Sequence, residues 1–213
     1  MIQTDHLTLL YQEHERKVYA CHDIDLKIEK GEFLGVLGPS GSGKSSLLYL
    51  LCGLKLSTSG TVFFENKNYS LLNDIERSFL RKNSFGFIFQ QPYLLGYLTV
   101  LENILIYSNK IDYAMYLLES LGLKKNIHDF PHQLSGGERQ RVCIARAIVH
   151  EPKIIFADEP TAFLDHQSGS EVINLLYKHK SESSLVMVTH DPSMLLNADR
   201  IIKMNDGQID LSG

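Results

Sequence analysis

The sequence predicts an α/β protein with a mostly parallel sheet flanked by helices, an N-terminal antiparallel β part and a helical insertion. Alternating apolar and polar residues over 19–28 indicate a half-exposed antiparallel strand. Between Thr99 and His150, apolar residues recur at helical spacing. Short unbroken apolar runs, typical of parallel strands buried on both faces, occupy residues 33–37, 85–89, 154–157 and 185–189.

Further strands are expected near both ends of the chain. Residues 60–64 follow a turn-rich stretch, and residues 201–204 and 208–211 flank Asn205-Asp206-Gly207, a sequence typical of a tight hairpin. We expect one domain over residues 1–213. Its core comprises residues 1–90 and 152–213, and its helical subdomain comprises residues 91–151.

Composition narrows the classes of protein. The chain has 213 residues, 44% of them hydrophobic, which suffices for a substantial core. A net charge of −4 argues against nucleic-acid binding driven by overall charge. The three cysteines lie far apart, which favours a reducing compartment over disulfides or a zinc site. No apolar run approaches membrane-spanning length and the N-terminus does not resemble a signal peptide, so we expect a cytosolic chain unless another subunit tethers it.

The most informative segment is Gly38-Pro39-Ser40-Gly41-Ser42-Gly43-Lys44-Ser45, which has the spacing of a phosphate-binding loop. Glycines let successive backbone N–H groups point at a phosphate, Lys44 reaches the outer phosphates, and the Ser45 hydroxyl can bind Mg²⁺. An apolar strand precedes the loop and a helix over residues 46–51 follows it, which is the context that the motif needs. The alternative is a Gly/Ser-rich surface turn.

Two acidic residues, Asp158 and Glu159, end the apolar strand 154–157. The carboxyl end of a buried strand is where ligands bind in open α/β sheets. Asp158 is suited to contact Mg²⁺ or its water, and Glu159 to polarise an attacking water. The alternative is an exposed strand end with two solvated acids.

Residues Ser135-Gly136-Gly137-Glu138 predict a helix start, because serine and a glutamate three residues later form a capping box. Glycine in the first turn loses helix propensity but leaves backbone N–H groups open to a phosphate. The chain therefore has two predicted phosphate-binding sites on separate subdomains. Two such sites in one chain usually serve two nucleotides in a dimer.

With these motifs the sequence resembles the ATP-hydrolysing subunit of an ABC transporter, which has a P-loop NTPase core. Leu134-Ser135-Gly136-Gly137-Glu138 resembles the signature motif of that family, and the resemblance covers essentially the whole chain. It is closest to the subfamily for lipoprotein release and for macrolide and peptide export. That closeness rests on the phosphate-binding loop and on residues 87–91, 98–103 and 131–138.

The resemblance implies ATP and Mg²⁺ as cofactors and assigns roles to single residues. Glu159 acts as general base, His190 holds the γ-phosphate, and Gln90 contacts Mg²⁺ and the attacking water. Mg²⁺ is then held by Ser45, Gln90 and Asp158. Nucleotide binding falls to Tyr11, Gly38, Pro39, Ser40, Gly41, Ser42, Gly43, Lys44, Ser45 and Ser46, and across a dimer to Ser135, Gly136, Gly137, Glu138 and Asp165.

Alternatives stay open for two of these roles. Tyr11, matched to the aromatic residue that stacks on adenine, also fits an edge-strand tyrosine, and Tyr19 is a weaker candidate for the same role. Gln90 also fits a polar strand end. The chain departs from the family pattern at Phe163, which is bulkier than usual, and between Tyr107 and His132, where it is short.

The implied partners are a separate transmembrane permease and a second cassette, either identical or related, with no nucleic acid. The chain would then lie on the inner face of the cell membrane and power export or extraction of a peptide, lipoprotein or hydrophobic compound. One alternative is a regulator of a membrane protein without transport, as in cell-division relatives. The other is a non-transport ABC ATPase, which would predict coiled-coil insertions, Cys-x-x-Cys pairs or two cassettes, and the sequence has none of these.

Overall fold

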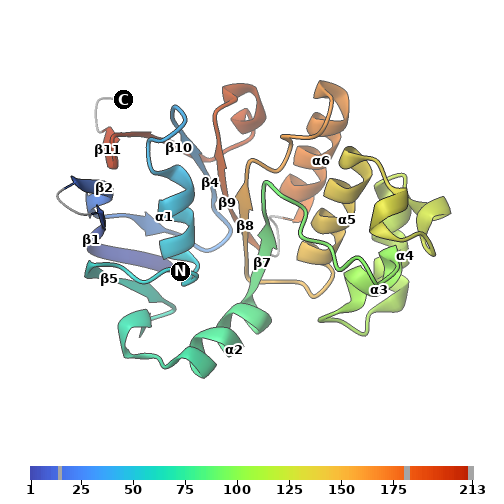
Figure 1. The fold of residues 1–213 in the computed structure, drawn as a ribbon, viewed down its shortest axis with the longest axis horizontal. Coiled ribbons are helices and arrows are strands. Elements are labelled where there is room, and N and C mark those ends of the chain that lie inside the picture. Colours follow the sequence, from blue (N-terminus) through green and yellow to red (C-terminus); the bar gives the residue numbers. More distant parts are fainter. Residues whose placement is uncertain (14–15, 180–182, 211–213) are drawn as a thin grey trace. The chain divides into compact units, whose positions relative to one another are not determined.

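A computed structural model describes residues 1–13, 16–179 and 183–210 of the chain (Figure 1). The chain divides into two compact units. Unit 1 comprises Met1–Arg81 and Val186–Gly213, and unit 2 comprises Lys82–Leu185. Each unit is described below by itself.

The N-terminal part of unit 1 is an antiparallel sheet built on one long strand. Strand β1 (Ile2–Glu13) pairs antiparallel with β2 (Arg16–Ile24), β3 (Lys27–Ile28) and β5 (Ser59–Phe64), and β5 also pairs with β6 (Lys67–Asn68). The strand predicted over residues 19–28 is interrupted after Ile24. The interruption coincides with Asp23, whose backbone is left-handed (φ 54°). Beyond it, the Leu26 amide donates to the Thr4 hydroxyl (2.7 Å).

Unit 1 also holds a parallel strand pair and the hairpin predicted near the C-terminus. Strand β4 (Phe33–Leu37) leads into helix α1 (Lys44–Leu51) and pairs in parallel with β10 (Arg200–Asn205). The strand order is β11-β10-β4-β9, where β9 is Ser184–Thr189 and β11 is Gln208–Asp210. Asp206 and Gly207 both have positive φ (44° and 78°), which confirms the predicted tight turn. Leu211, the last residue of the predicted hairpin, lies outside the described residues.

The remaining elements of unit 1 connect these strands. Short helix η1 (Tyr69–Leu71) precedes helix α2 (Asp74–Ser84), whose last turn runs into unit 2, and η4 (Pro192–Leu195) follows β9. Leu195 packs so close to Gly35 that a Cβ there would meet its side chain at 2.8 Å. Strand β4 is therefore covered tightly, as its unbroken apolar sequence predicts.

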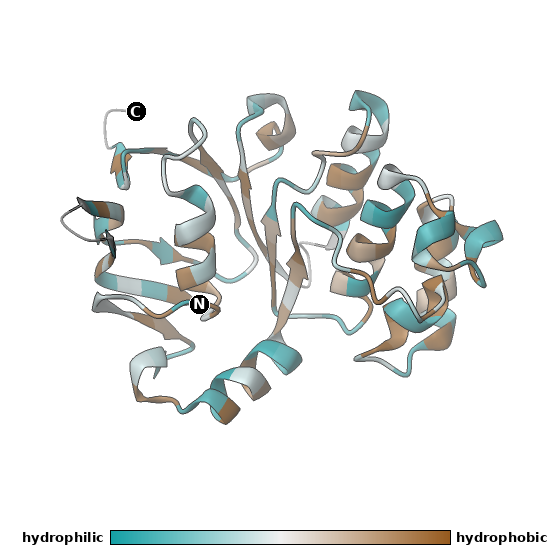
Figure 2. Cartoon of the chain, viewed as in Figure 1, coloured by the Kyte–Doolittle hydropathy of each residue, from teal (hydrophilic) through white to brown (hydrophobic). Residues whose placement is uncertain are grey.

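Unit 2 contains a parallel strand pair and the predicted helices. Strand β7 (Phe85–Ile88) pairs in parallel with β8 (Ile154–Asp158), whose apolar residues are brown in Figure 2. The helices are α3 (Val100–Leu105), α4 (Ile111–Ser120), α5 (Gly136–Ile148) and α6 (His166–His179), with short helices η2 (Lys124–Asn126) and η3 (Pro131–Gln133). The helical insertion predicted from periodicity is confirmed.

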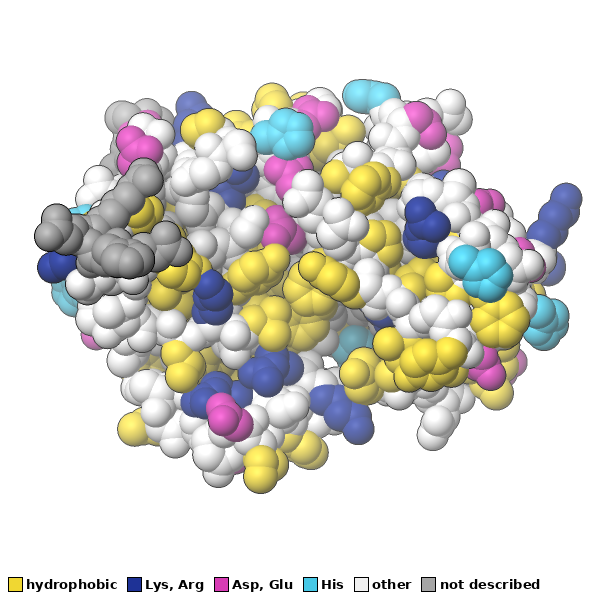
Figure 3. Space-filling model, in the orientation of Figure 1, with side chains coloured by type: hydrophobic (Ala, Val, Ile, Leu, Met, Phe, Trp, Pro, Cys, Tyr) yellow, Lys and Arg dark blue, Asp and Glu magenta, His cyan; other side chains and the backbone are white. Residues whose placement is uncertain are grey.

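These elements confirm the predicted fold class, namely an antiparallel N-terminal β part, parallel strands with helices, and a helical insertion. The limits of the helical subdomain at residues 91 and 151 stay a prediction. No helix among the described residues is both long and apolar enough to cross a membrane. Lys and Arg side chains are interspersed with Asp and Glu on the face shown in Figure 3.

Candidate nucleotide-binding site

The predicted phosphate-binding loop joins β4 to α1 in unit 1, and two of its glycines leave no room for a side chain. A Cβ at Gly38 would meet the Met204 carbonyl oxygen at 2.3 Å. Gly43 has φ 100°, and its Cβ would meet the Ala20 carbonyl oxygen at 2.0 Å. The backbone of the loop is therefore pressed against β10 and β2, which fixes its path where only glycine fits.

Lys44 holds the loop in a tight curl. Its ammonium group donates to the carbonyl oxygens of Gly38 and Pro39, both at 2.8 Å, although the residue is only 8% exposed. The Ser42 amide also donates to the Pro39 carbonyl (3.2 Å), while the buried Ser42 hydroxyl has no partner among the described residues. A positive charge is thus fixed inside a ring of backbone groups, which is an arrangement suited to an anion.

The start of α1 suits a phosphate as well. Gly43 is the N-cap and makes no side-chain cap hydrogen bond, and the first turn contains no acidic residue. The N-terminus of a helix carries partial positive charge from its first N–H groups, which bind anions well when no side chain competes for them. Ser45 and Ser46 lie in this turn.

Tyr11 lies on β1 opposite Val18 and is 39% exposed. The Lys55 ammonium group contacts the Tyr11 hydroxyl and lies 4.3 Å from the centre of its ring. Tyr19, the weaker candidate, is also exposed, and its ring centre lies 4.5 Å from that of His22. Adenine stacking on Tyr11 stays a prediction. In that arrangement the adenine and the Lys55 ammonium group would both contact the Tyr11 ring.

In unit 2, Asp158 ends β8, Glu159 directly follows it, and Gln90 follows the neighbouring parallel strand β7. Ile88 at the end of β7 pairs with Ala157 near the end of β8, so the three side chains belong to the same edge of this strand pair. Asp158 is buried, whereas Gln90 is exposed. Glu159 has φ 46°, a left-handed conformation that is uncommon outside glycine and turns the chain sharply after Asp158.

The signature segment, residues 134–138, opens α5 with the predicted capping box. The Ser135 amide and hydroxyl donate to the Glu138 carboxylate (2.8 and 2.7 Å), and the Glu138 amide donates to the Ser135 hydroxyl (3.3 Å). The Ser135 hydroxyl and amide hydrogen bonds hold the pKa of Glu138 below its usual value. The box is therefore formed with an ionised carboxylate.

Residues 161–165 lie beside the signature segment within unit 2. A Cβ at Gly136 would come no closer than 3.9 Å to the Phe163 side chain, and one at Gly137 would meet Leu164 at 3.2 Å. Phe163 is 45% exposed. Asp165 accepts from the Ser168 amide (3.0 Å) and hydroxyl (2.7 Å), which lowers its pKa and caps α6. Asp165 thus has a structural role within its own chain.

The predicted site residues fall into two groups. Tyr11, the phosphate-binding loop and His190, an exposed residue after β9, belong to unit 1. Gln90, Asp158, Glu159, the signature segment and Asp165 belong to unit 2. Sequence reasoning did not single out Gln140, which is fully buried in α5 and bonded to the segments after β7 and β8. The signal available was a neutral polar residue on the apolar face of a predicted helix.

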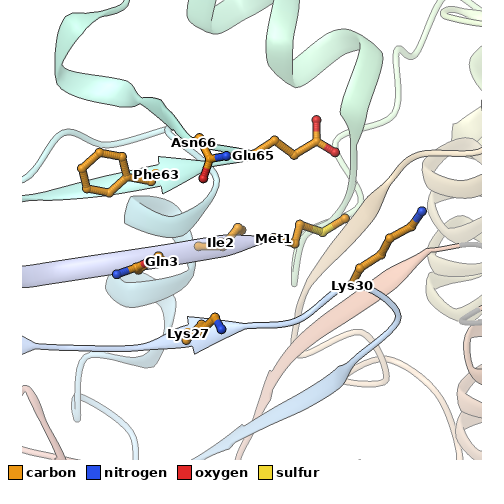
Figure 4. Close-up of a pocket in the computed structure, with 8 residues that line it drawn as sticks. All are labelled: Met1, Ile2, Gln3, Lys27, Lys30, Phe63, Glu65 and Asn66. Carbon is orange, nitrogen blue, oxygen red and sulfur yellow. The ribbon is translucent and has the colours of Figure 1, made fainter.

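A cavity of about 630 Å³ in unit 1 lies apart from these residues (Figure 4). Its lining comes from β1, β3, β5 and the turn after β5, together with Met1 before β1 and Lys30 after β3. No predicted nucleotide-site residue lines it. This cavity is therefore separate from the predicted phosphate-binding loop.

Known proteins resemble the chain over nearly its full length. The family model described as ABC transporter matches residues 21–162. The lipoprotein-releasing system ATP-binding protein LolD of Aquifex aeolicus (strain VF5) is 40% identical over 94% of this chain and 96% of its own length. The macrolide export ATP-binding/permease protein MacB of Aggregatibacter actinomycetemcomitans is also 40% identical, over 98% of this chain but 34% of its own length. The dimeric post-hydrolysis structure of the ATP-binding cassette MJ0796, bound to ADP and Pi, superimposes with a TM-score of 0.93 at 36% identity, covering 99% of this chain and 97% of that one.

Proposed function

This chain belongs to the ABC transporter family, and from that premise we propose that it is the ATP-hydrolysing subunit that drives a separate transmembrane permease. It is an ATPase of the cassette type. The observation that carries the proposal is the phosphate-binding loop with its enclosed Lys44 ammonium group. In the proposed site the ATP phosphates replace the loop carbonyls as partners of Lys44 and accept from the N–H groups at the start of α1.

The donor set suits Mg²⁺. The Ser45 hydroxyl, the Asp158 carboxylate and the Gln90 amide offer oxygen atoms, which Mg²⁺ prefers as ligands. When bound, Mg²⁺ neutralises part of the charge on the phosphates.

We assign hydrolysis to Glu159, Gln90 and His190. Glu159 accepts a proton from the attacking water, and its left-handed backbone (φ 46°) turns the chain directly after Asp158. Gln90 follows the neighbouring strand at the same edge and orients that water through its amide. His190 donates a hydrogen bond to the γ-phosphate.

The active form in this proposal is a dimer of cassettes, since the related cassette MJ0796 is dimeric with ADP and Pi. Ser135, Gly136, Gly137 and Glu138 of one copy contact the nucleotide held by the other copy. A Cβ at Gly136 would meet the Phe163 side chain at no less than 3.9 Å, which supports an opening for a phosphate at the start of α5. Asp165 contributes through the loop that it anchors on α6.

The permease and cargo belong to this proposal as well. The lipoprotein-releasing relative, matched over 96% of its own length, is the ATP-binding protein of its system, and this likeness supports a permease on another chain. The cassette then lies at the cytoplasmic face of the membrane and powers export or extraction of a peptide, lipoprotein or hydrophobic compound.

The test is Glu159→Gln in the full chain. We expect ATP hydrolysis to fall about 10²- to 10⁴-fold, as for loss of a positioned base, while ATP binding is kept. The blocked variant should accumulate as a closed dimer with ATP, which light scattering would measure. Glu151→Gln is the matched control, because Glu151 also has positive φ (55°) but precedes β8. It should turn over ATP at the wild-type rate.

Two results would contradict the proposal. Hydrolysis by Glu159→Gln at a rate near wild type would remove Glu159 as the base. A variant that binds ATP but stays monomeric at saturating nucleotide would remove the dimer.

A further inference from the structure

We propose that Gln140 is a positioning residue for ATP hydrolysis, which ties the backbone beside Gln90 and the backbone beside Glu159 to the signature helix α5. This inference rests on the proposed function. Gln140 contacts neither nucleotide nor water in this scheme. It acts through the two segments that carry the proposed water-activating side chains.

The contacts are specific. Gln140 has no exposed surface, and its Nε2 donates to the carbonyl oxygen of Phe89 at 3.2 Å and to that of Pro160 at 3.1 Å. Phe89 directly precedes Gln90, and Pro160 directly follows Glu159. One amide group therefore fixes a backbone atom next to each of the two side chains.

The chemistry of the amide fixes its orientation. Both partners are carbonyl oxygens, which accept only, so the nitrogen with its two N–H groups must face them. The Oε1 atom is then buried without a hydrogen-bond partner among the described residues. Leaving a buried acceptor unpaired costs free energy. The two hydrogen bonds of Nε2 are thus made although the amide oxygen has no hydrogen-bond partner among the described residues.

Neighbouring residues on the same face of α5 hold the segment after β7 but not the one after β8. Cys143 contacts the Pro92 carbonyl, and Arg146 donates to the carbonyls of Pro92 (3.0 Å) and Tyr93 (2.9 Å). These bonds anchor residues 92–93 along the helix. Gln140 adds the connection to Pro160, so the start of α5, Gln90 and Glu159 move as one body.

The test compares Gln140→Leu with Asn103→Leu in the full chain. Leucine is close in size to glutamine but donates nothing, so kcat for ATP should fall about 10- to 100-fold, the scale of a misplaced catalytic group. KM for ATP should stay within about threefold, because the phosphate-binding loop is untouched. Asn103 is the matched control, since it is equally buried and its Nδ2 bonds the carbonyls of Leu95, Leu98 and Thr99. Asn103→Leu should lose stability but keep kcat.

The inference is overturned if folded Gln140→Leu keeps kcat within twofold, if Asn103→Leu lowers kcat equally, or if KM rises instead. Should Gln140→Leu fail to fold, Gln140→Asn retains the amide but is one methylene too short to reach both carbonyls. It should lose kcat about 3- to 10-fold, and wild-type kcat would refute the bridge. If the wild-type chain hydrolyses ATP and Gln140→Leu has the same kcat, only this inference is refuted. If the wild-type chain does not hydrolyse ATP, the proposed function is refuted.

Discussion

Helices α3 and α5 begin with the same capping box but differ in the two residues that follow the cap. At α3, the Thr99 amide and hydroxyl donate to Glu102 at 2.8 Å, and the Glu102 amide donates back at 3.3 Å. At α5, Ser135 and Glu138 repeat these distances to within 0.1 Å. The hydrogen bonds that start the two helices are therefore equivalent.

The two residues between the cap and the glutamate differ between the helices. At α3 they are Val100, which is fully buried, and Leu101, whereas at α5 they are Gly136 and Gly137. A glycine costs up to about 1 kcal/mol of helix propensity relative to alanine, so glycine is not what a stable helix start requires. The comparison shows that Val100 fills the space beside the first turn of α3, whereas Gly136 leaves space beside that of α5, and Gly137 lies close to Leu164.

Among the tests of this difference between α3 and α5, the largest effect is expected from Gly136→Asp. An aspartate in the first turn favours the helix, so thermal stability should be unchanged or slightly raised. Its charge would face the phosphates in the proposed dimer, and ATP hydrolysis should fall about 100-fold, as for loss of one transition-state donor. Hydrolysis rates and melting temperatures measured together check both expectations.

Gly136→Ala serves as the control, because it adds a methyl group without charge. It should gain up to about 1 kcal/mol of stability and lose less activity than Gly136→Asp. Near-wild-type hydrolysis by Gly136→Asp would show that this turn does not meet a phosphate.

A smaller effect is expected from removing each cap in turn. Ser135→Ala and Thr99→Ala should each cost about 1 kcal/mol of unfolding free energy, because the boxes are equivalent. Only Ser135→Ala should also slow ATP hydrolysis, by about 10-fold, the equivalent of one hydrogen bond to a charged group. Urea unfolding and steady-state hydrolysis of both variants measure the two effects. Equal hydrolysis by both would leave Ser135 with a structural role alone.

The smallest effect is the acid sensitivity of the two boxes. Hydrogen bonds from Thr99 lower the pKa of Glu102, and those from Ser135 lower the pKa of Glu138, from an ordinary value of 4.5. Since the folded pKa is the lower one, this stabilisation is present above pH 4.5 and is lost as pH falls through the folded value. Glu102→Gln and Glu138→Gln should each reduce, by a similar amount, the fall in stability between pH 6 and pH 4. The midpoints of urea unfolding at the two pH values measure this fall. A clearly unequal change would mean that the boxes differ electrostatically.

The fold could be predicted from sequence where a local pattern decides the structure. Strand β4 has the predicted bounds, and the Asp206-Gly207 turn and the Ser135 capping box follow from residue types at fixed spacing. Strand β1, the long centre of the antiparallel sheet, was not predicted. Its buried residues Ile2 and Thr4 are out of phase with Leu7 and Leu9, because His6 between them has positive φ (46°), so no single alternation of apolar and polar residues runs along it. Helix α2 was not predicted either, since Ile75, Phe79 and Leu80 are the few apolar residues in an otherwise polar segment, which gives a weak helical pattern.

The same division holds for the candidate site. The motif residues of the phosphate-binding loop and of the signature segment were readable because glycine, lysine and serine at those spacings suit phosphates. The close approach of Ala20 and Met204 to that loop was not readable, since it depends on strands brought together by folding. Gln140 was not predicted for the same reason. The two carbonyl groups that accept its hydrogen bonds lie 51 and 20 residues away in the sequence.

The three cysteines, Cys21, Cys52 and Cys143, are all buried, and none of these three described residues is in a disulfide. Burial raises the pKa of the Cys21 thiol to about 12 and that of Cys143 to about 11, so little reactive thiolate exists near neutral pH. A cysteine placed at exposed Phe163 would then be the one thiol that a maleimide dye modifies quickly. The native chain is thus ready for site-specific fluorescent labelling with its own cysteines left in place.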